Sequence, residues 1–212
     1  MDHSGQIAAA GDHAREVLER THVAREGALV ASRRAIRTCA TAIRAVHRRE
    51  FREARELVAE AAAYVAEMDA AVDAHPDVRY TGYVSDAKKE FAEANLTFAF
   101  VDGHAMPSAR ELGVDVAAYL NGMAEAASEL RRQVLDRLRV DDIEEAERLL
   151  GVMDDVYTLL VTVDYPDAIT GGLRRTTDAL RAVLERTRGD VTNALVAAKL
   201  RAAMGDTTAP ST

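Results

Sequence analysis

The sequence predicts an all-α protein, and its composition and its apolar periodicity both support this class. The 212 residues include only 4 Pro and 12 Gly, and aromatic residues make up 5% of the chain. Ala and Leu are plentiful, which favours helices over strands. Apolar residues also recur mostly at steps of three and four, as on the buried face of a helix. We expect one elongated bundle of about six or seven helices over residues 1–205, followed by a disordered tail at 206–212.

The first helix is predicted over residues 7–47, a segment without Pro and with Gly only at positions 11 and 27. Cys39 falls in its apolar register and is expected in the core. His47, near its end, is expected to pack or to cap the helix, with phosphate contact as the alternative. The remaining positions form the densest basic segment of the chain, whose candidate nucleic-acid contacts are Arg33, Arg37, Arg44 and Arg48. A solvated face without a ligand is the alternative interpretation.

Turn-forming residues separate the next elements. A second helix is expected over residues 51–74, and Pro76 ends it because proline cannot continue the helical hydrogen bonds. Residues 78–83 form a short connector, which we expect to be the most extended part of the chain. Ser85 or Asp86 then caps a third helix, since either side chain can accept a hydrogen bond from the first helical turn.

The third helix is expected to reach about Val101. In the loop that follows, Ser108 and Glu111 stand three residues apart, which is the spacing of a capping box. Two further helices are predicted over residues 114–140 and 142–163.

Two helices are predicted in the last part of the chain. The first runs from about residue 169 or 172 to Arg186. The second begins at Asp190, a candidate N-cap that follows Gly189, and continues to Ala203.

Two carboxylate pairs carry the strongest chemical signal. Glu90 and Glu93 lie three residues apart, and Glu125 and Glu129 lie four apart. Each spacing places both carboxylates on one face of a helix, and two such helices packed together could gather all four. The candidate catalytic residues and ligands of Mg²⁺, with Mn²⁺ as a substitute, are therefore Glu90, Glu93, Glu125 and Glu129. The alternative is that the acids form ion pairs with Lys89 and Arg132 on a wet surface.

Charge and cysteine content narrow the class of protein. The net charge of −8, taken alone, argues against nucleic acid as a partner. However, only three of the 27 basic residues are lysines and the others are arginines, which pair with phosphates and stack on bases. The single cysteine excludes an intrachain disulfide and fits a reducing interior. Since there is no apolar run of 18 residues and no signal-peptide pattern, we expect a cytoplasmic protein.

Three segments resemble the translin family. Ser32-Arg33, Ala42-Ile43-Arg44 and Val46-His47-Arg48 together resemble the first-helix signature of that family. Residues 90–94, Glu-Phe-Ala-Glu-Ala, are similar to the Glu-aromatic-x-Glu-Ala segment of its factor X branch. Residues 119–132 are similar to the Tyr-Leu-x-Gly-x-x-Asp-x-x-x-Glu-Leu-x-Arg of the same branch. Their order and spacing make the resemblance more specific than any one segment.

The resemblance implies an all-helical subunit of a hollow octameric shell that binds RNA or single-stranded DNA inside. For the factor X branch it also implies RNA cleavage with Mg²⁺ held by acids on two neighbouring helices, at the positions of the four glutamates named above. The family usually has Asp where this chain has Glu125, so the carboxylate reaches about one methylene further. Glu93 and Glu129 are the expected direct ligands, and Glu90 and Glu125 are further ligands or the base that orients the attacking water.

These observations predict a homo-oligomeric, Mg²⁺-dependent endoribonuclease acting on single-stranded or partly structured RNA. A bound Mg²⁺ would make its water more acidic and offset the charge that builds on the phosphoryl oxygens. Two alternatives remain open. One is a shell that binds single-stranded RNA or DNA without cleavage, and the other is a helical scaffold with no nucleic-acid role.

Overall fold

The computed structural model describes residues 3–206, and within this range it contains helices and no strand. The long helices are α1 (His3–His47), α2 (Phe51–Val72), α4 (Gly82–Asp102), α6 (Val116–Arg139), α7 (Ile143–Leu160) and α9 (Leu173–Asp206). The single-turn helices are α3 (Pro76–Arg79), α5 (Ala109–Leu112) and α8 (Asp167–Thr170). The all-α prediction is confirmed. Of the predicted tail, Asp206 belongs to α9 and residues 207–212 lie outside the described residues.

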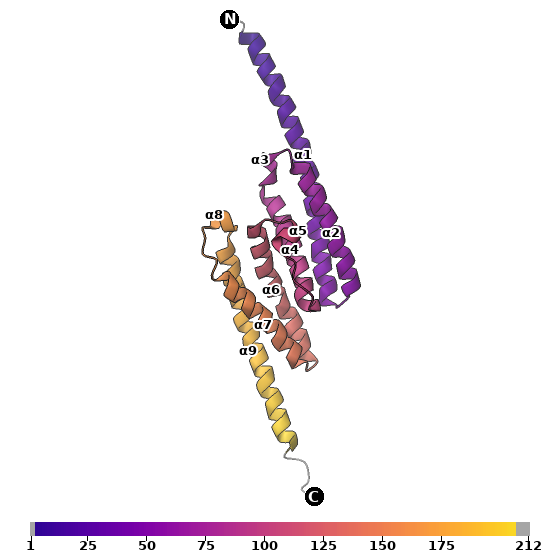
Figure 1. Cartoon of the computed structure of the whole chain (residues 1–212), viewed down its shortest axis with the longest axis vertical. Coiled ribbons are helices and arrows are strands. Elements are labelled where there is room, and N and C mark those ends of the chain that lie inside the picture. Colours follow the sequence, from indigo (N-terminus) through magenta and orange to yellow (C-terminus); the bar gives the residue numbers. More distant parts are fainter. Residues whose placement is uncertain (1–2, 207–212) are drawn as a thin grey trace.

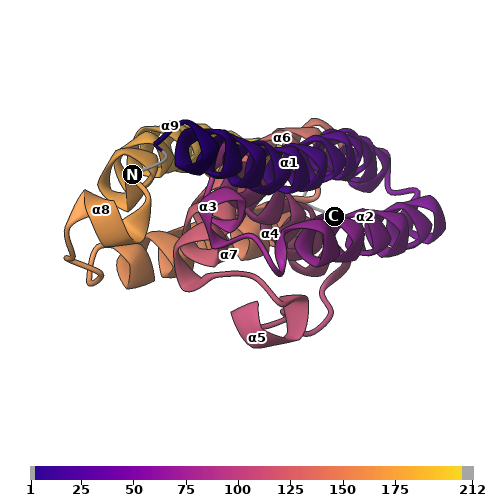
Figure 2. The same ribbon diagram turned by 90° about the horizontal axis from the view of Figure 1, so that it is seen from above.

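The long helices form an elongated bundle in which α6 is central (Figure 1). Helix α1 packs against α2 and α4, while α6 packs against α4, α7 and α9. The N-terminal end of α1 and the C-terminal end of α9 project from opposite ends of the bundle (Figure 1). Seen from above, α2 and α8 lie at opposite sides with α4 between them (Figure 2). Within residues 3–206, no helix has the length and hydropathy needed to cross a bilayer.

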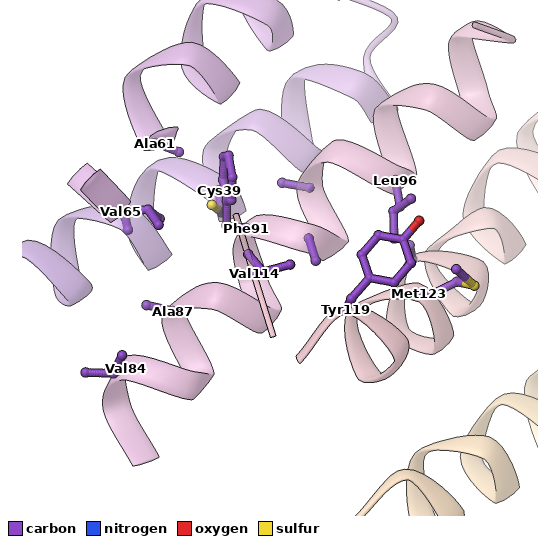
Figure 3. Close-up of a cluster of buried hydrophobic side chains, with 14 of the residues drawn as sticks. Cys39, Ala61, Val65, Val84, Ala87, Phe91, Leu96, Val114, Tyr119 and Met123 are labelled. Atoms are coloured by element: carbon purple, nitrogen blue, oxygen red, sulfur yellow. The ribbon is translucent and has the colours of Figure 1, made fainter. Parts of the chain in front are cut away.

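Two apolar clusters form the core. The first joins α1, α2, α4 and α6 and includes Cys39, Phe91, Leu96, Tyr119 and Met123. Cys39 is fully buried beside Phe91, which confirms its predicted place in the core (Figure 3). The second cluster continues toward the other end of the bundle and includes Val46, Leu130, Leu149, Met153 and Leu184.

The predicted extended connector at residues 78–83 is wrong. Pro76 opens the single-turn helix α3 instead, because proline at the first helical position already has a suitable φ and its missing N–H is not needed there. The expected caps of the next helix, Ser85 and Asp86, are wrong as well. The N-cap residue is Thr81, and Ser85 and Asp86 already lie inside α4.

The predicted capping box is confirmed and begins α5. The side chain of Ser108 accepts a hydrogen bond from the backbone N–H of Glu111, and the carboxylate of Glu111 accepts one from the backbone N–H of Ser108 at 2.8 Å. These two bonds satisfy N–H groups that the short helix leaves without a helical partner.

The last two predicted helices are a single helix, α9. A Cβ added at Gly189 would meet nothing within 4 Å, so no close contact requires glycine at this position. Asp190 does not cap a helix but pairs with Arg131 of α6 at 2.8 Å. Leu184 and Val191 are buried on either side of this position, so packing against α6 carries the helix through it.

Helices α4 and α6 are in close contact at Gly122. A Cβ at this position would lie 2.6 Å from the carbonyl oxygen of Lys89, 2.9 Å from Cβ of Ala92 and 3.0 Å from the backbone nitrogen of Glu93. Two of these atoms belong to the backbone of α4, which cannot rotate away as a side chain could. Glycine therefore permits this distance between the helices.

We expect Gly122→Ala to lower the free energy of unfolding by about 1–3 kcal/mol, the usual cost of overpacking a core. The matched control is Gly151→Ala in α7, where an added Cβ meets nothing within 4 Å. This control should gain about 0.5–1 kcal/mol, because Ala favours a helix over Gly. Urea denaturation followed by circular dichroism measures both changes. Equal effects of the two substitutions would contradict the close contact.

Candidate functional site

The contact at Gly122 brings the two predicted carboxylate pairs together. Glu90 and Glu93 lie on α4, and Glu125 and Glu129 lie three and seven residues after Gly122 on α6. The backbone atoms nearest to Gly122 belong to Lys89 and Glu93, so this part of α4 lies directly against α6. Residues three or four apart project from the same face of a helix, so the two carboxylates of each pair lie on one side of this contact.

Three of the four carboxylates form a compact group. Glu90, Glu93 and Glu125 each offer one carboxylate oxygen, and the three oxygens lie within 4.8 Å of one another. Glu93 is buried, with 8% of its surface exposed, whereas the other two are partly exposed. Burial raises the pKa of Glu93 to about 8, and the negative charges of the other three glutamates add to this effect. Without a bound cation, the carboxyl group of Glu93 therefore holds a proton at neutral pH.

Lys89 supplies a positive charge within this group. Its Nζ lies 2.7 Å from Oε2 of Glu125 and 3.4 Å from Oε1 of Glu90. The sequence suggested instead an ion pair with Glu93, four residues along the same helix. The close contact between α4 and α6 gives Lys89 a partner on the other helix, so the ammonium group bridges the two helices.

Glu129 has a different partner. Its Oε2 lies 2.7 Å from Nε2 of His47, at the C-terminal end of α1. The side-chain amide of Gln133 donates to Nδ1 of His47 at 3.2 Å, so the proton of the imidazole is on Nε2 and is donated to Glu129. This hydrogen bond lowers the pKa of Glu129 and keeps its carboxylate ionised. His47 is buried at the helix end, as expected, and it also orients Glu129.

The group of three carboxylates fits a hard divalent cation. In an octahedral Mg²⁺ site with bonds of about 2.1 Å, opposite ligand atoms are about 4.2 Å apart. The three oxygens lie within 4.8 Å of one another, so they are grouped closely enough to be candidate ligands of one such ion. The buried Glu93 is also destabilised by its neighbours when ionised, and a cation between the carboxylates would relieve that repulsion.

The candidate nucleic-acid contacts are all exposed. Arg33, Arg37 and Arg44 lie on α1, and Arg48 lies in the turn directly after it. Arg44 precedes His47 by three residues, and residues at this spacing are neighbours on a helix surface. The basic face of α1 therefore borders the acidic site at its Glu129 end. Arg48 pairs with the nearby Glu50 and Glu53, which offset part of its charge.

The sequence did not connect Lys89 with Glu125 or His47 with Glu129, and it did not single out Gln133 or Arg139. His47 and Glu129 are 82 residues apart in the chain, so no local spacing could connect them. Arg139 lines a surface hollow on α6 together with Glu129 and Arg132. The only sequence signal for this hollow is the helical spacing of its residues after Glu129.

Comparison with known proteins gives relatives in both sequence and structure, although no family model matches the chain. The uncharacterized protein MJ0175 of Methanocaldococcus jannaschii is 32% identical over 179 residues, which are 84% of this chain and 79% of that protein. The structure of AfC3PO in complex with duplex RNA is similar with a TM-score of 0.82 and 32% identity, and the match covers 88% of this chain and 96% of that one. AfC3PO alone gives a TM-score of 0.81 over 88% and 97% of the two chains. The structure of apo-NeC3PO has a TM-score of 0.78 at 19% identity, which shows a shared fold alone.

We expect Glu93→Gln to stabilise the metal-free protein, and more so at pH 8 than at pH 5. The pKa of Glu93 is raised from 4.5 to about 8, so the wild-type protein loses free energy of unfolding as the pH rises across this window. Glutamine has no proton to lose. Thermal unfolding in EDTA should show a difference of about 1–3 kcal/mol at pH 8 that shrinks toward pH 5.

The control for this experiment is Glu147→Gln, an exposed position on α7. It should change stability little and without this pH dependence. A difference between Glu93→Gln and wild type that stays constant from pH 5 to pH 8 would contradict the raised pKa.

Proposed function

Because this chain belongs to the translin family of C3PO-type proteins, we propose that it is a Mg²⁺-dependent endoribonuclease acting on single-stranded or partly structured RNA. The observation that carries the proposal is the group of three carboxylate oxygens within 4.8 Å at the contact of α4 and α6. A purely structural role offers no reason to bury Glu93 among like charges, whereas cation binding does.

The four glutamates have distinct roles in this proposal. Glu90, Glu93 and Glu125 would hold the cation, and the proton of Glu93 would have to leave for its carboxylate to serve as a ligand. Bound Mg²⁺ supplies a more acidic water and offsets charge on the phosphoryl oxygens. Glu129 was expected to be a direct ligand, but it lies outside the group of three carboxylates. It is ionised and held in place by His47, so in this proposal it is suited to orient the attacking water and accept its proton.

RNA binding is assigned to two sets of arginines. The first is the exposed arginines of α1, and the second is Arg132 and Arg139, which line the hollow on α6 together with Glu129. Guanidinium groups pair with phosphates through parallel hydrogen bonds, independently of sequence. The relative AfC3PO is known in complex with duplex RNA, so duplexes should be tested beside single strands.

We also propose that the chain self-associates, with a homo-octamer as the expected assembly. The N-terminal part of α1 projects from the bundle (Figure 1) and exposes apolar side chains, with Ile7 71%, Leu18 67% and Val23 63% exposed. A second copy packed on this segment would remove them from water. Light scattering measures the assembly, and a mass near the 23.0 kDa of one chain would contradict it.

The alternative function is binding of single-stranded RNA or DNA without cleavage. In that case the arginines act as described, and the carboxylates serve only the structure. Glu129→Ala separates the two functions, because it removes the proposed chemistry and leaves the arginines in place.

The first experiment is cleavage of a labelled single-stranded RNA by wild type and Glu129→Ala, each with Mg²⁺ and with EDTA. We expect Mg²⁺-dependent cleavage that falls by about 10²–10⁴-fold in Glu129→Ala, the range for loss of a general base. The exposed control Glu147→Gln should cleave as wild type does. Cleavage that survives Glu129→Ala would point to a contaminating nuclease or another site. RNA binding without cleavage by the wild-type protein would support the alternative function.

The basic face of α1 predicts that the affinity for RNA falls as the salt concentration rises. A triple variant with Arg33→Ala, Arg37→Ala and Arg44→Ala should bind RNA more weakly, and its slope of log K against log salt should be shallower by about 2, since each lost contact with a single strand removes about 0.7. Fluorescence anisotropy in EDTA measures both quantities without cleavage. Arg181→Ala, at an exposed position of α9, is the control. An unchanged slope in the triple variant would exclude this face from the RNA contact.

A further inference from the structure

The ammonium group of Lys89 contacts two of the carboxylates that would hold a bound cation. Its Nζ is 2.7 Å and 2.9 Å from the two carboxylate oxygens of Glu125, and 3.4 Å from Oε1 of Glu90. These are two of the three carboxylates whose oxygens converge within 4.8 Å. The Lys89 side chain is 24% exposed, so the ammonium group lies inside the rim of the acidic site and not in open solvent.

We propose that Lys89 is a built-in competitor of the divalent cation: its ammonium group occupies Glu90 and Glu125 in the free protein and must leave both carboxylates when a metal binds. The inference rests on the proposed function, because it assumes that these carboxylates hold a metal. The lone pair that faces the ammonium group is not available to Mg²⁺, and two cations held a few ångströms apart repel each other.

The structure offers Lys89 a place to move. A cavity of about 210 Å³ adjoins the acidic site and is lined by Lys89 and Glu125, together with Asp86, Asp115 and Asn121. The lysine stem has four rotatable carbons, so its ammonium group can swing into this cavity without movement of the backbone of α4. There Asp86 is an acidic partner that can replace Glu125. Asp115 adds a second negative charge, although its Oδ2 also lies 3.9 Å from Nζ of Lys88 and Arg175 lines the same cavity.

The same ammonium group serves the metal-free protein. It offsets part of the charge of a site in which Glu93 is buried among three other carboxylates. Loss of Lys89 should therefore lower the stability of the metal-free protein, because the carboxylates lose a favourable partner. It should also raise the affinity for the metal, because a competitor is removed. If Lys89 only strengthened the packing of α4 on α6, its loss would change the stability and leave the metal affinity unchanged.

The test is the affinity for Mn²⁺, measured by titration calorimetry on the full chain without RNA at one pH. In Lys89→Met we expect the Kd for Mn²⁺ to fall about tenfold, within the usual range for coupling between neighbouring ligands. Lys199→Met, which removes an exposed charge on α9, should leave the Kd unchanged. In EDTA, the melting temperature of Lys89→Met should be below that of wild type, and Mn²⁺ should raise it by more. An equal or weaker affinity in Lys89→Met overturns the inference.

A second measurement uses the wild-type protein and does not depend on how a variant folds. Acetylation of lysines, mapped by mass spectrometry, should modify Lys89 faster with saturating Mn²⁺ than with EDTA, relative to Lys199. Equal rates at Lys89 in the two conditions overturn the inference. If neither wild type nor Lys89→Met binds Mn²⁺ at millimolar concentration, the metal centre itself is excluded and the proposed function fails with it. If Glu93→Gln abolishes Mn²⁺ binding and Lys89→Met leaves the affinity unchanged, the inference is overturned and the proposed function stands.

Discussion

The close contact of α4 and α6 at Gly122 is the constraint on which the rest of the structure depends. Helix α6 also packs against α7 and α9, so its distance from α4 decides how both halves of the bundle meet. The atoms that leave no room for a side chain at Gly122 belong to Lys89, Ala92 and Glu93. The residues that fix this distance are thus the neighbours of the acids, and one additional methyl group would separate carboxylates that must converge within ångströms.

The site holds carboxyl groups in two different protonation states. Glu93 keeps a proton near neutral pH because it is buried among like charges, whereas Glu129 stays ionised because His47 donates to it. Pairs of acids whose pKa values are pushed apart by their surroundings are typical of sites that bind cations or transfer protons. The arrangement destabilises the fold locally, and the apolar clusters on either side provide the stability that makes it tolerable.

Five of the six long helices could be predicted from the sequence, and so could the positions of the four glutamates on α4 and α6, because both follow from spacings of three and four residues. Pro76 and Asp190 were misread since each is ambiguous in the sequence: proline both ends and begins helices, and aspartate both caps helices and forms ion pairs. Which role applies depends on packing partners such as Arg131. The bonds of Lys89 to Glu125 and of His47 to Glu129 could not be predicted, because they join helices whose relative placement is a tertiary property.

Cys39, the one cysteine of the chain, lies on the face of α1 that is turned toward the acids. Burial raises the pKa of its thiol to about 12, and the charges of Glu90 and Glu93 add to the effect. Since only the thiolate reacts, the thiol of the folded chain is nearly inert at neutral pH. Its alkylation therefore requires α1 to separate transiently from α4. The chain carries a natural chemical reporter, and the rate at which a thiol reagent modifies Cys39 measures the free energy of that local opening.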